Sequence, residues 1–202
     1  MSAHTPSPST VLSGRSASAG RLVAPVARVA LFALLLWGAA AAGEIPIPGT
    51  PVPITLQTFV VMLAALTLNW REAGSAVALY LAAGAAGLPV FAGGASTAAL
   101  LGPSAGFLIG FLPGAVLTAA LKGSPDSAAA LPLRLARLFA AALAGCVVVV
   151  YAFGFLVQSA FTGAPLAAVA LASMGFVAGD VVKAVVAVAV AAGVARLSSA
   201  RR

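Results

Sequence analysis

Six long apolar runs constrain this 202-residue chain more than any other feature. A helix needs about 20 apolar residues to cross the roughly 30 Å hydrocarbon core of a bilayer, and about 17 to 25 are tolerated. Runs near this length occupy residues 22–42, 54–69, 73–88, 104–121, 135–155 and 180–197. Only 7% of the residues are charged, against about 25% in soluble domains. The sequence therefore predicts an all-α membrane protein with six transmembrane helices in one bundle.

The ends of the chain are expected to lie outside this bundle. Residues 1–21 are rich in Ser, Ala, Pro and Thr, and such a segment buries too little apolar surface to offset the entropy lost on ordering. We expect a disordered cytoplasmic tail there, then one membrane domain over residues 22–197 and a short basic tail over 198–202. The apolar segment 165–174 is too short to span, so it is expected to form a re-entrant or half-helical element.

Basic residues are distributed unevenly between the two sides of this predicted bundle. If the N-terminus is cytoplasmic, the inner segments hold Arg15, Arg21, Arg28, Arg71, Lys122, Arg134, Arg137, Arg196, Arg201 and Arg202. The outer segments 43–53, 89–103 and 157–179 hold no Lys or Arg. The positive-inside rule then places both termini on the inner side of the cytoplasmic membrane. Topology accounts for the net charge of +7 better than nucleic-acid binding does, because no polar or aromatic recognition surface accompanies the basic residues.

The predicted outer loops are rich in Pro and Gly. Four prolines between Pro46 and Pro53 restrict the first loop to extended conformations, which suits a stiff lid over a pocket, although a plain connector is equally possible. The second loop, 89–103, is apolar but interrupted by Pro and Gly. Irregular backbone at membrane depth survives only where protein covers it or where it lines a cavity. We therefore expect the second loop to enter the outer mouth of the bundle.

Asp180 and Lys183 are ionisable residues inside the last apolar run. A charged side chain costs roughly 2.5 to 3.5 kcal/mol at mid-bilayer, so the pair needs compensation. Asp180 suits an N-cap position, and Lys183 lies over the same helix face one turn later. Either the two side chains only satisfy each other, or they bind a small solute with N–H donors and an anionic end. Gln57, one turn into the second run, faces the bundle either as interhelical glue or as a ligand contact.

The other polar and small residues favour packing over chemistry. The only His is His4, the only Cys is Cys146, and no metal-ligand cluster, nucleophile–base pair or G-x-x-x-x-G-K-[ST] loop can be assembled. We therefore expect no enzymatic activity and no cofactor. Glycines recur every four residues from Gly102 to Gly114, a pattern that favours close helix packing over ligand contact.

Four sequence blocks carry a family resemblance. They are PVPITLQ at 51–57, LYLAAGAAGLPVFAGG at 79–94, GPSAGFLIGF at 102–111 and GDVVK at 179–183. In these blocks, which occur in the same order, the chain resembles the biotin transporter family BioY. That family comprises the substrate-binding S components of energy-coupling factor (ECF) transporters. The resemblance extends from about Arg28 to Leu197 and implies a six-helix fold with cytoplasmic termini and a biotin site near the outer face.

The resemblance also implies residues for that site. Asp180 and Lys183 match the family's G-D-x-x-K block and are expected to contact biotin, with the ureido N–H groups on Asp180 and the carboxylate on Lys183 as one assignment. Tyr80 and Tyr151 match family aromatics and are expected to line the pocket or to pack in the core. Further candidate substrate-binding residues are Gln57, Thr55, Phe91, Gly93 and Gly94. The covering loop offers only Ser96 and Thr97 as polar groups, so the partner of the carboxylate stays open.

The implied partners are biotin, membrane lipid, a transmembrane T component and two ATP-binding cassette ATPases. The Ala-x-x-x-Ala pattern that S components often show in the first helix is absent, because Leu or Trp follows Ala27, Ala30 and Ala33 four residues on. Docking is then expected on other small residues, such as Ala78, Ala82 and Ala86. The alternative functions are an S component for another vitamin, a solitary biotin facilitator, or a non-transporting membrane scaffold in which Asp180 and Lys183 merely pair.

Overall fold

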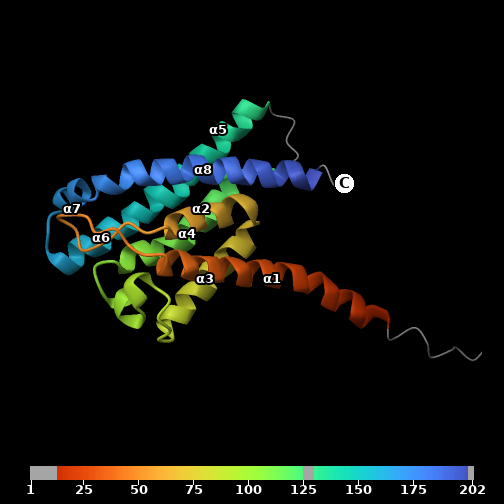
Figure 1. Ribbon diagram of the computed structural model, residues 1–202, viewed down its shortest axis with the longest axis horizontal. Helices are drawn as coiled ribbons and strands as arrows, with labels where there is room; N and C mark the ends of the chain where they lie inside the picture. The colour runs from red at the N-terminus through yellow and green to blue at the C-terminus, as the bar shows by residue number, and fades with distance from the viewer. Residues whose placement is uncertain (1–12, 125–129, 200–202) are drawn as a thin grey trace, which may run out of the picture.

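The computed structural model describes the backbone of residues 13–124 and 130–199, and within these ranges it contains helices and no strand. The helices run roughly along one long axis (Figure 1). They are α1 (Ser13–Ala41), α2 (Gln57–Thr67), α3 (Trp70–Ala85), α4 (Ala105–Leu121), α5 (Leu131–Ala142), α6 (Val150–Thr162), α7 (Leu166–Ala172) and α8 (Met174–Ser199). A π-helical segment, η3 (Leu143–Val149), joins α5 and α6, and two 3₁₀ turns, η1 (Ala92–Gly94) and η2 (Thr97–Leu101), precede α4. The predicted all-helical class is confirmed.

Several helices have the length and surface of membrane spans. Within the described residues, three helical stretches are long and apolar enough to cross a bilayer: Val23–Ala41, Leu131–Thr162 and Met174–Ser198. Two shorter apolar helices are Gln57–Thr67 and Ala105–Leu121. Large apolar side chains such as Leu34, Val148 and Val182 are exposed on the outside of these helices. A continuous apolar exterior of this kind marks a surface that is covered by lipid or protein.

The helix boundaries differ from the predicted ones in several places. α1 begins at Ser13 rather than at residue 22. The first part of the predicted disordered tail, residues 1–12, lies outside the described residues. α2 begins at Gln57 rather than at residue 54, because Ile54 exchanges two backbone hydrogen bonds with Ile45. The predicted basic tail 198–202 overlaps the end of α8, and its last three residues are also outside the described part.

The beginning of α8 corrects the predicted N-cap role of Asp180. This helix begins at Met174, which places Asp180 in its second turn rather than at its first residue. Gly175 and Gly179 both lie inside this helix, where tertiary packing outweighs glycine's weak helix propensity. A Cβ at Gly175 would lie 3.3 Å from the side chain of Ile47, so this turn packs directly on the first loop. The expected short element at 165–174 is present as α7.

The loops gather at one end of the bundle, which we call the loop end: residues 42–56, 86–104 and 163–173 (left side of Figure 1). The starts of α1 and α5 and the end of α8 lie toward the opposite end. There the side chain of Lys122 donates to the carbonyls of Ala65, Leu66 and Leu68 and so caps α2. Lys122 thereby satisfies carbonyls that the helix itself leaves unpaired.

The glycine stripe of α4 confirms the packing interpretation. A Cβ at Gly106 would overlap the carbonyl oxygen of Phe153 on α6, and one at Gly114 would lie 2.7 Å from the carbonyl oxygen of Gly145 in η3. The backbones of α4 and the α5–α6 helix therefore approach each other closely, as small residues permit. This contact places the aromatic side chains of α4 and α6 beside each other at the loop end.

Candidate functional site

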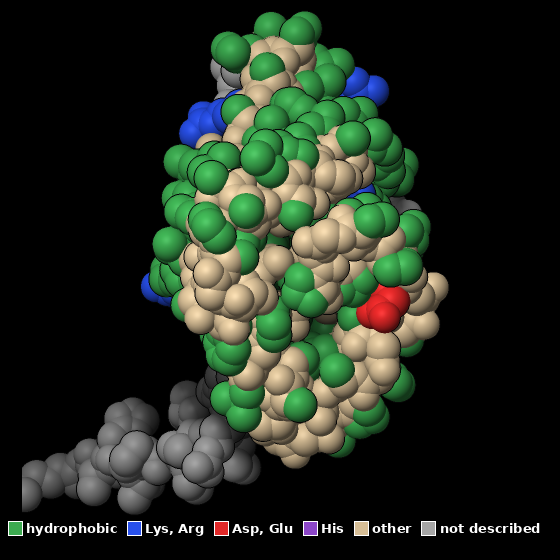
Figure 2. All heavy atoms as spheres, turned by 90° about the vertical axis from the view of Figure 1, so that its left-hand side faces the viewer, with side chains coloured by type: hydrophobic (Ala, Val, Ile, Leu, Met, Phe, Trp, Pro, Cys, Tyr) green, Lys and Arg blue, Asp and Glu red, His purple; other side chains and the backbone are tan. Residues whose placement is uncertain are grey.

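A cavity of about 250 Å³ opens at the loop end, between α2, α4, α6 and α8. The first loop, through residues such as Val52 and Thr55, and the second loop, through Phe91, Ala95 and Ala99, contribute to its lining. Figure 2 looks onto this end of the molecule and shows the surface hollowed between the loops. The second loop thus forms part of the cavity wall. The volume is just below the range of about 300 to 1,000 Å³ that is common for small-molecule sites.

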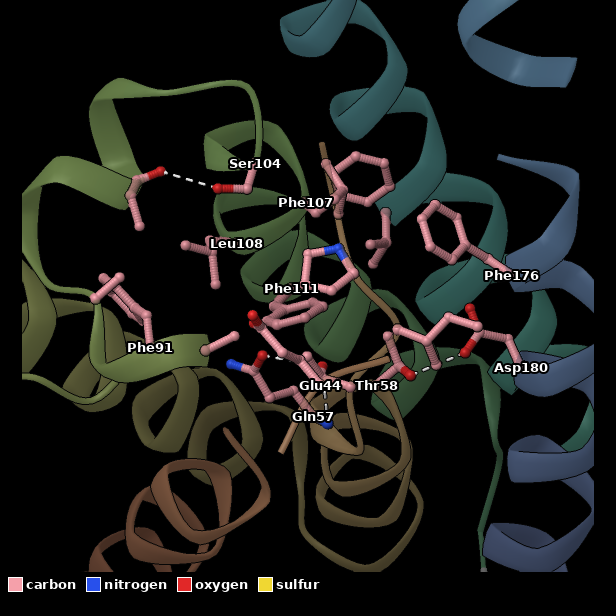
Figure 3. Close-up of a pocket in the computed structure, with 18 of the residues that line it drawn as sticks. Glu44, Gln57, Thr58, Phe91, Ser104, Phe107, Leu108, Phe111, Phe176 and Asp180 are labelled. Atoms are coloured by element: carbon pink, nitrogen blue, oxygen red, sulfur yellow. Dashed lines mark hydrogen bonds between the residues drawn. The ribbon is translucent and has the colours of Figure 1, made fainter. Parts of the chain in front are cut away.

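Four side chains form what we call the polar cage: Asp180 and Lys183 of α8, Thr58 of α2 and Tyr151 of α6. Asp180 is only 3% exposed. Its Oδ1 accepts from Lys183 Nζ and from Thr58 Oγ1, both at 2.9 Å, and its Oδ2 accepts from the Tyr151 hydroxyl at 2.7 Å. Asp180 and Lys183 lie one turn apart on α8, and the Asp180 carboxylate contacts both α2, through Thr58, and α6, through Tyr151. Figure 3 shows Asp180 beside Thr58.

The polar cage has spare acceptor capacity but no spare donor. An ammonium group carries three N–H donors, and Lys183 uses all of them: on Asp180, on Thr58 Oγ1 at 2.9 Å and on the carbonyl of Thr55 at 2.8 Å. The hydroxyl hydrogens of Thr58 and Tyr151 are both donated to Asp180. A carboxylate offers about four acceptor sites, and Asp180 fills three of them. The free site on Oδ2 suits an N–H donor.

A second hydrogen-bond chain supports the floor of the cavity. Gln57 lies at the first turn of α2, accepts from Thr55 Oγ1 at 3.0 Å and donates to the hydroxyl of Tyr80. That hydroxyl donates in turn to the carbonyl oxygen of Val90 at 3.0 Å. Gln57 therefore connects α2 with α3, as the predicted interhelical role requires, and it also lines the cavity. These hydrogen bonds hold the second loop against α2 and α3.

Aromatic rings form the apolar wall. Phe107 of α4 lies edge-on to Phe155 and to Phe176, each at a centroid distance of 6.0 Å, and Tyr151 lies 6.4 Å from Phe107. On the other side of the cavity, Phe91 packs edge-on against Tyr80 at 5.3 Å. Figure 3 shows Phe91 and Leu108 on one side and Phe176 with Asp180 on the other. The cavity is thus bounded by aromatic and aliphatic side chains on two sides.

The structure brings most of the predicted site residues to one cavity. Those that line it are Asp180, Lys183, Tyr151, Gln57, Thr55 and Phe91. Tyr80 is buried behind Gln57 and takes the packing role. Gly93 and Gly94 belong to the covering loop, where φ angles of 65° and 73° require glycine, but they lie outside the lining.

Sequence reasoning missed several lining residues. Thr58 directly follows Gln57, and that polar pair at the start of an apolar helix was the available signal. Phe107 and Phe176 gave no signal, because aromatic residues are ordinary in apolar helices. Glu44 also lines the cavity, and it is exposed in the first loop. Its position could have been suspected, since it is the only charged residue of the three outer segments.

Comparisons with known proteins show which family the chain resembles. The BioY family model matches residues 10–200. The biotin transporter BioY of Rhizobium etli is 38% identical over 160 residues, covering 78% of this chain and 86% of the relative. The biotin transporter BioY of Thermotoga maritima is 37% identical over 160 residues, covering 78% and 89%.

A solved structure shares the fold. It is the crystal structure of the S-component for biotin from an ECF-type ABC transporter, with a TM-score of 0.80 and 27% sequence identity. The match covers 89% of this chain and 93% of the other. Together with the family match over most of its length, this shows that the chain belongs to the BioY family.

Proposed function

We propose that this protein binds biotin in the cavity at the loop end and takes it up across the cytoplasmic membrane as the S component of an ECF-type transporter. The observation that carries the proposal is the polar cage, a buried and hydrogen-bonded ion pair that faces a cavity in a fold shared with an S component for biotin. Ionisable residues at such depth are costly and mark substrate sites.

The proposed topology has six spans: α1, α2, α3, α4, the continuous α5–α6 helix and α8. Both termini lie in the cytoplasm and the loop end faces outward. Support comes from the charge distribution, because the loop-end segments lack Lys and Arg, while Lys122 directly follows the end of α4 that is remote from the loop end. The membrane domain then corresponds to residues 22–197, with α7 as a half-helix beneath the outer surface.

In the proposed binding mode the ureido ring of biotin enters the polar cage. One ureido N–H donates to the free acceptor site on Oδ2 of Asp180, and the bicyclic ring packs between Phe91 and the aromatic wall around Tyr151 and Phe176. Lys183 and Thr58 hold the Asp180 carboxylate in position. The other assignment, biotin's carboxylate on Lys183, requires one of the three bonds of that ammonium group to break.

The proposed partners are a T component and two ATP-binding cassette ATPases, since the chain has no phosphate-binding loop of its own. Biotin binding would close the loops and favour the docked form through its differential affinity for the two states. Ala78, Ala82 and Ala86 are exposed along one face of α3 and its C-cap, which makes this small-residue face available for docking.

Binding of biotin to the purified protein tests the proposal. We expect Asp180→Asn and Lys183→Ala each to weaken binding by roughly 10- to 100-fold, because a hydrogen bond to a charged group contributes about 1.5 to 3 kcal/mol. Gly193→Ala is the control, since its Cβ would meet nothing within 4 Å. Unchanged affinity in both charge variants would remove the site, and absence of biotin binding by the folded wild-type protein would refute the function.

A further inference from the structure

A negative charge, the carboxylate of Glu44, lies at the opening of the cavity and has no role in the binding mode proposed above. Glu44 lines the cavity and is exposed in the first loop. Within the described residues, the ion pairs are Arg28–Glu72 and Asp180–Lys183, and neither includes Glu44. The outer segments 43–53, 89–103 and 157–179 contain no Lys or Arg that could neutralise it.

The surface around Glu44 also lacks positive charge. Figure 2 shows the acidic side-chain atoms of this face on its right, with no basic side chain next to them. Gly93 of the covering loop is next to the Glu44 carboxylate, because a Cβ there would lie 3.6 Å from both carboxylate oxygens. The first and second loops thus meet at this anionic group. A ligand that reaches the opening meets a negative potential and finds no described cation beyond the saturated Lys183.

The polar cage determines which end of a ligand meets Glu44. Its donors are all used within the protein, while one acceptor site on Asp180 is free. A ureido ring can occupy the cage because it supplies N–H donors, whereas a carboxylate there would face other acceptors without a donor. The ring therefore lies inside, and the valeryl chain of biotin points to the opening.

From this we infer that Glu44 sets the specificity of the site for the charge of the ligand's tail: it disfavours the free carboxylate of biotin and favours biotin amides whose tail is neutral or cationic. The inference rests on the proposed function, since it assumes that the ureido ring is bound in the polar cage. Two like charges about 4 Å apart repel several times more strongly near a protein surface than in bulk water, because the effective dielectric constant is lower there. A carboxyl group converted to an amide escapes this repulsion, and an amine on the tail gains an attraction.

The test compares three ligands on the purified full-length protein: biotin, biotinamide and N-(2-aminoethyl)biotinamide, which are anionic, neutral and cationic. We expect affinity to rise in that order, with biotin and the cationic amide separated by on the order of tenfold or more in low salt. Between about 0.01 M and 1 M salt the Debye length falls from about 30 Å to about 3 Å, so the differences should shrink. In Glu44→Gln the ratio of the three dissociation constants should approach one, whereas Glu44→Asp, which keeps the charge, should retain the wild-type order.

Two results would overturn the inference. If biotin binds the wild-type protein as tightly as its amides in low salt, Glu44 does not act on the tail. If Glu44→Gln weakens the binding of all three ligands equally, Glu44 accepts a hydrogen bond from the ureido ring. The ligand then lies with its ring at the opening and its tail toward the polar cage. Both results leave biotin binding itself intact. Failure of all three ligands to bind the folded wild-type protein would instead refute the proposed function.

Discussion

At the scale of single residues, Thr58 links the two charges of the site. Its hydroxyl donates to Asp180 and accepts from Lys183, each at 2.9 Å, although the residue belongs to a different helix. The charged pair itself could be predicted from the sequence, because charged side chains in an apolar run are costly and usually have a structural or functional role. The role of Thr58 could not be predicted, because a threonine in an apolar helix has a small free-energy cost. Its role depends on which face of α2 packs against α8.

Replacing Thr58 tests this link. Thr58→Val keeps the shape of the side chain but removes the hydroxyl, so Lys183 loses an acceptor and Asp180 loses a donor. We expect biotin affinity to fall by roughly 10-fold and the melting temperature in detergent to fall as well, because a buried group left without its partner costs about 1 to 3 kcal/mol. Thr58→Ser preserves the hydroxyl and is the matched control. Equal affinity of the Val and Ser variants would show that the hydroxyl does not position the ion pair.

At the scale of elements, the helices follow from the hydropathy pattern, and the close contact of α4 with α6 follows from the glycine stripe. The beginning of α8 does not follow, because the apolar run that predicts this helix starts only at residue 180. Tertiary contacts decided it: the first loop packs on this turn through Ile47, and the helix continues back to Met174. Loop placement was predictable only in outline, since the bonds of Tyr80 with Gln57 and Val90 involve three separate segments.

Gly84 makes the placement of the second loop testable. A Cβ at this position of α3 would overlap the ring of Phe91, which lines the cavity. We expect Gly84→Ala to displace Phe91 and to weaken biotin binding by roughly 3- to 10-fold, in line with overpacking costs of about 1 to 3 kcal/mol. Gly193→Ala, in an open part of α8, should leave binding unchanged and gain up to about 1 kcal/mol in helix propensity. Equal binding by the two variants would mean that the position of Phe91 does not matter for the ligand.

At the scale of the whole molecule, the distribution of basic residues and the position of the cavity follow the same long axis of the bundle. The loop-end segments border the cavity and hold no Lys or Arg, whereas Lys122 lies where it donates to the last carbonyls of α2, at the other end. Cysteine accessibility can test the orientation because the chain's own Cys146 is completely buried and can be replaced by Ala. Ala98, exposed in η2 at the loop end, and Ser198, exposed near the end of α8, then serve as single cysteine positions.

We expect a membrane-impermeant maleimide to label Ala98→Cys on intact cells, because the positive-inside rule puts the end without Lys or Arg on the outer side. Ser198→Cys should be labelled only after the membrane is permeabilised. Labelling of both variants after permeabilisation is the control for folding and expression. The reverse pattern would place the cavity on the cytoplasmic side. Biotin would then reach Asp180 from within the cell, and uptake from outside could not begin at this site.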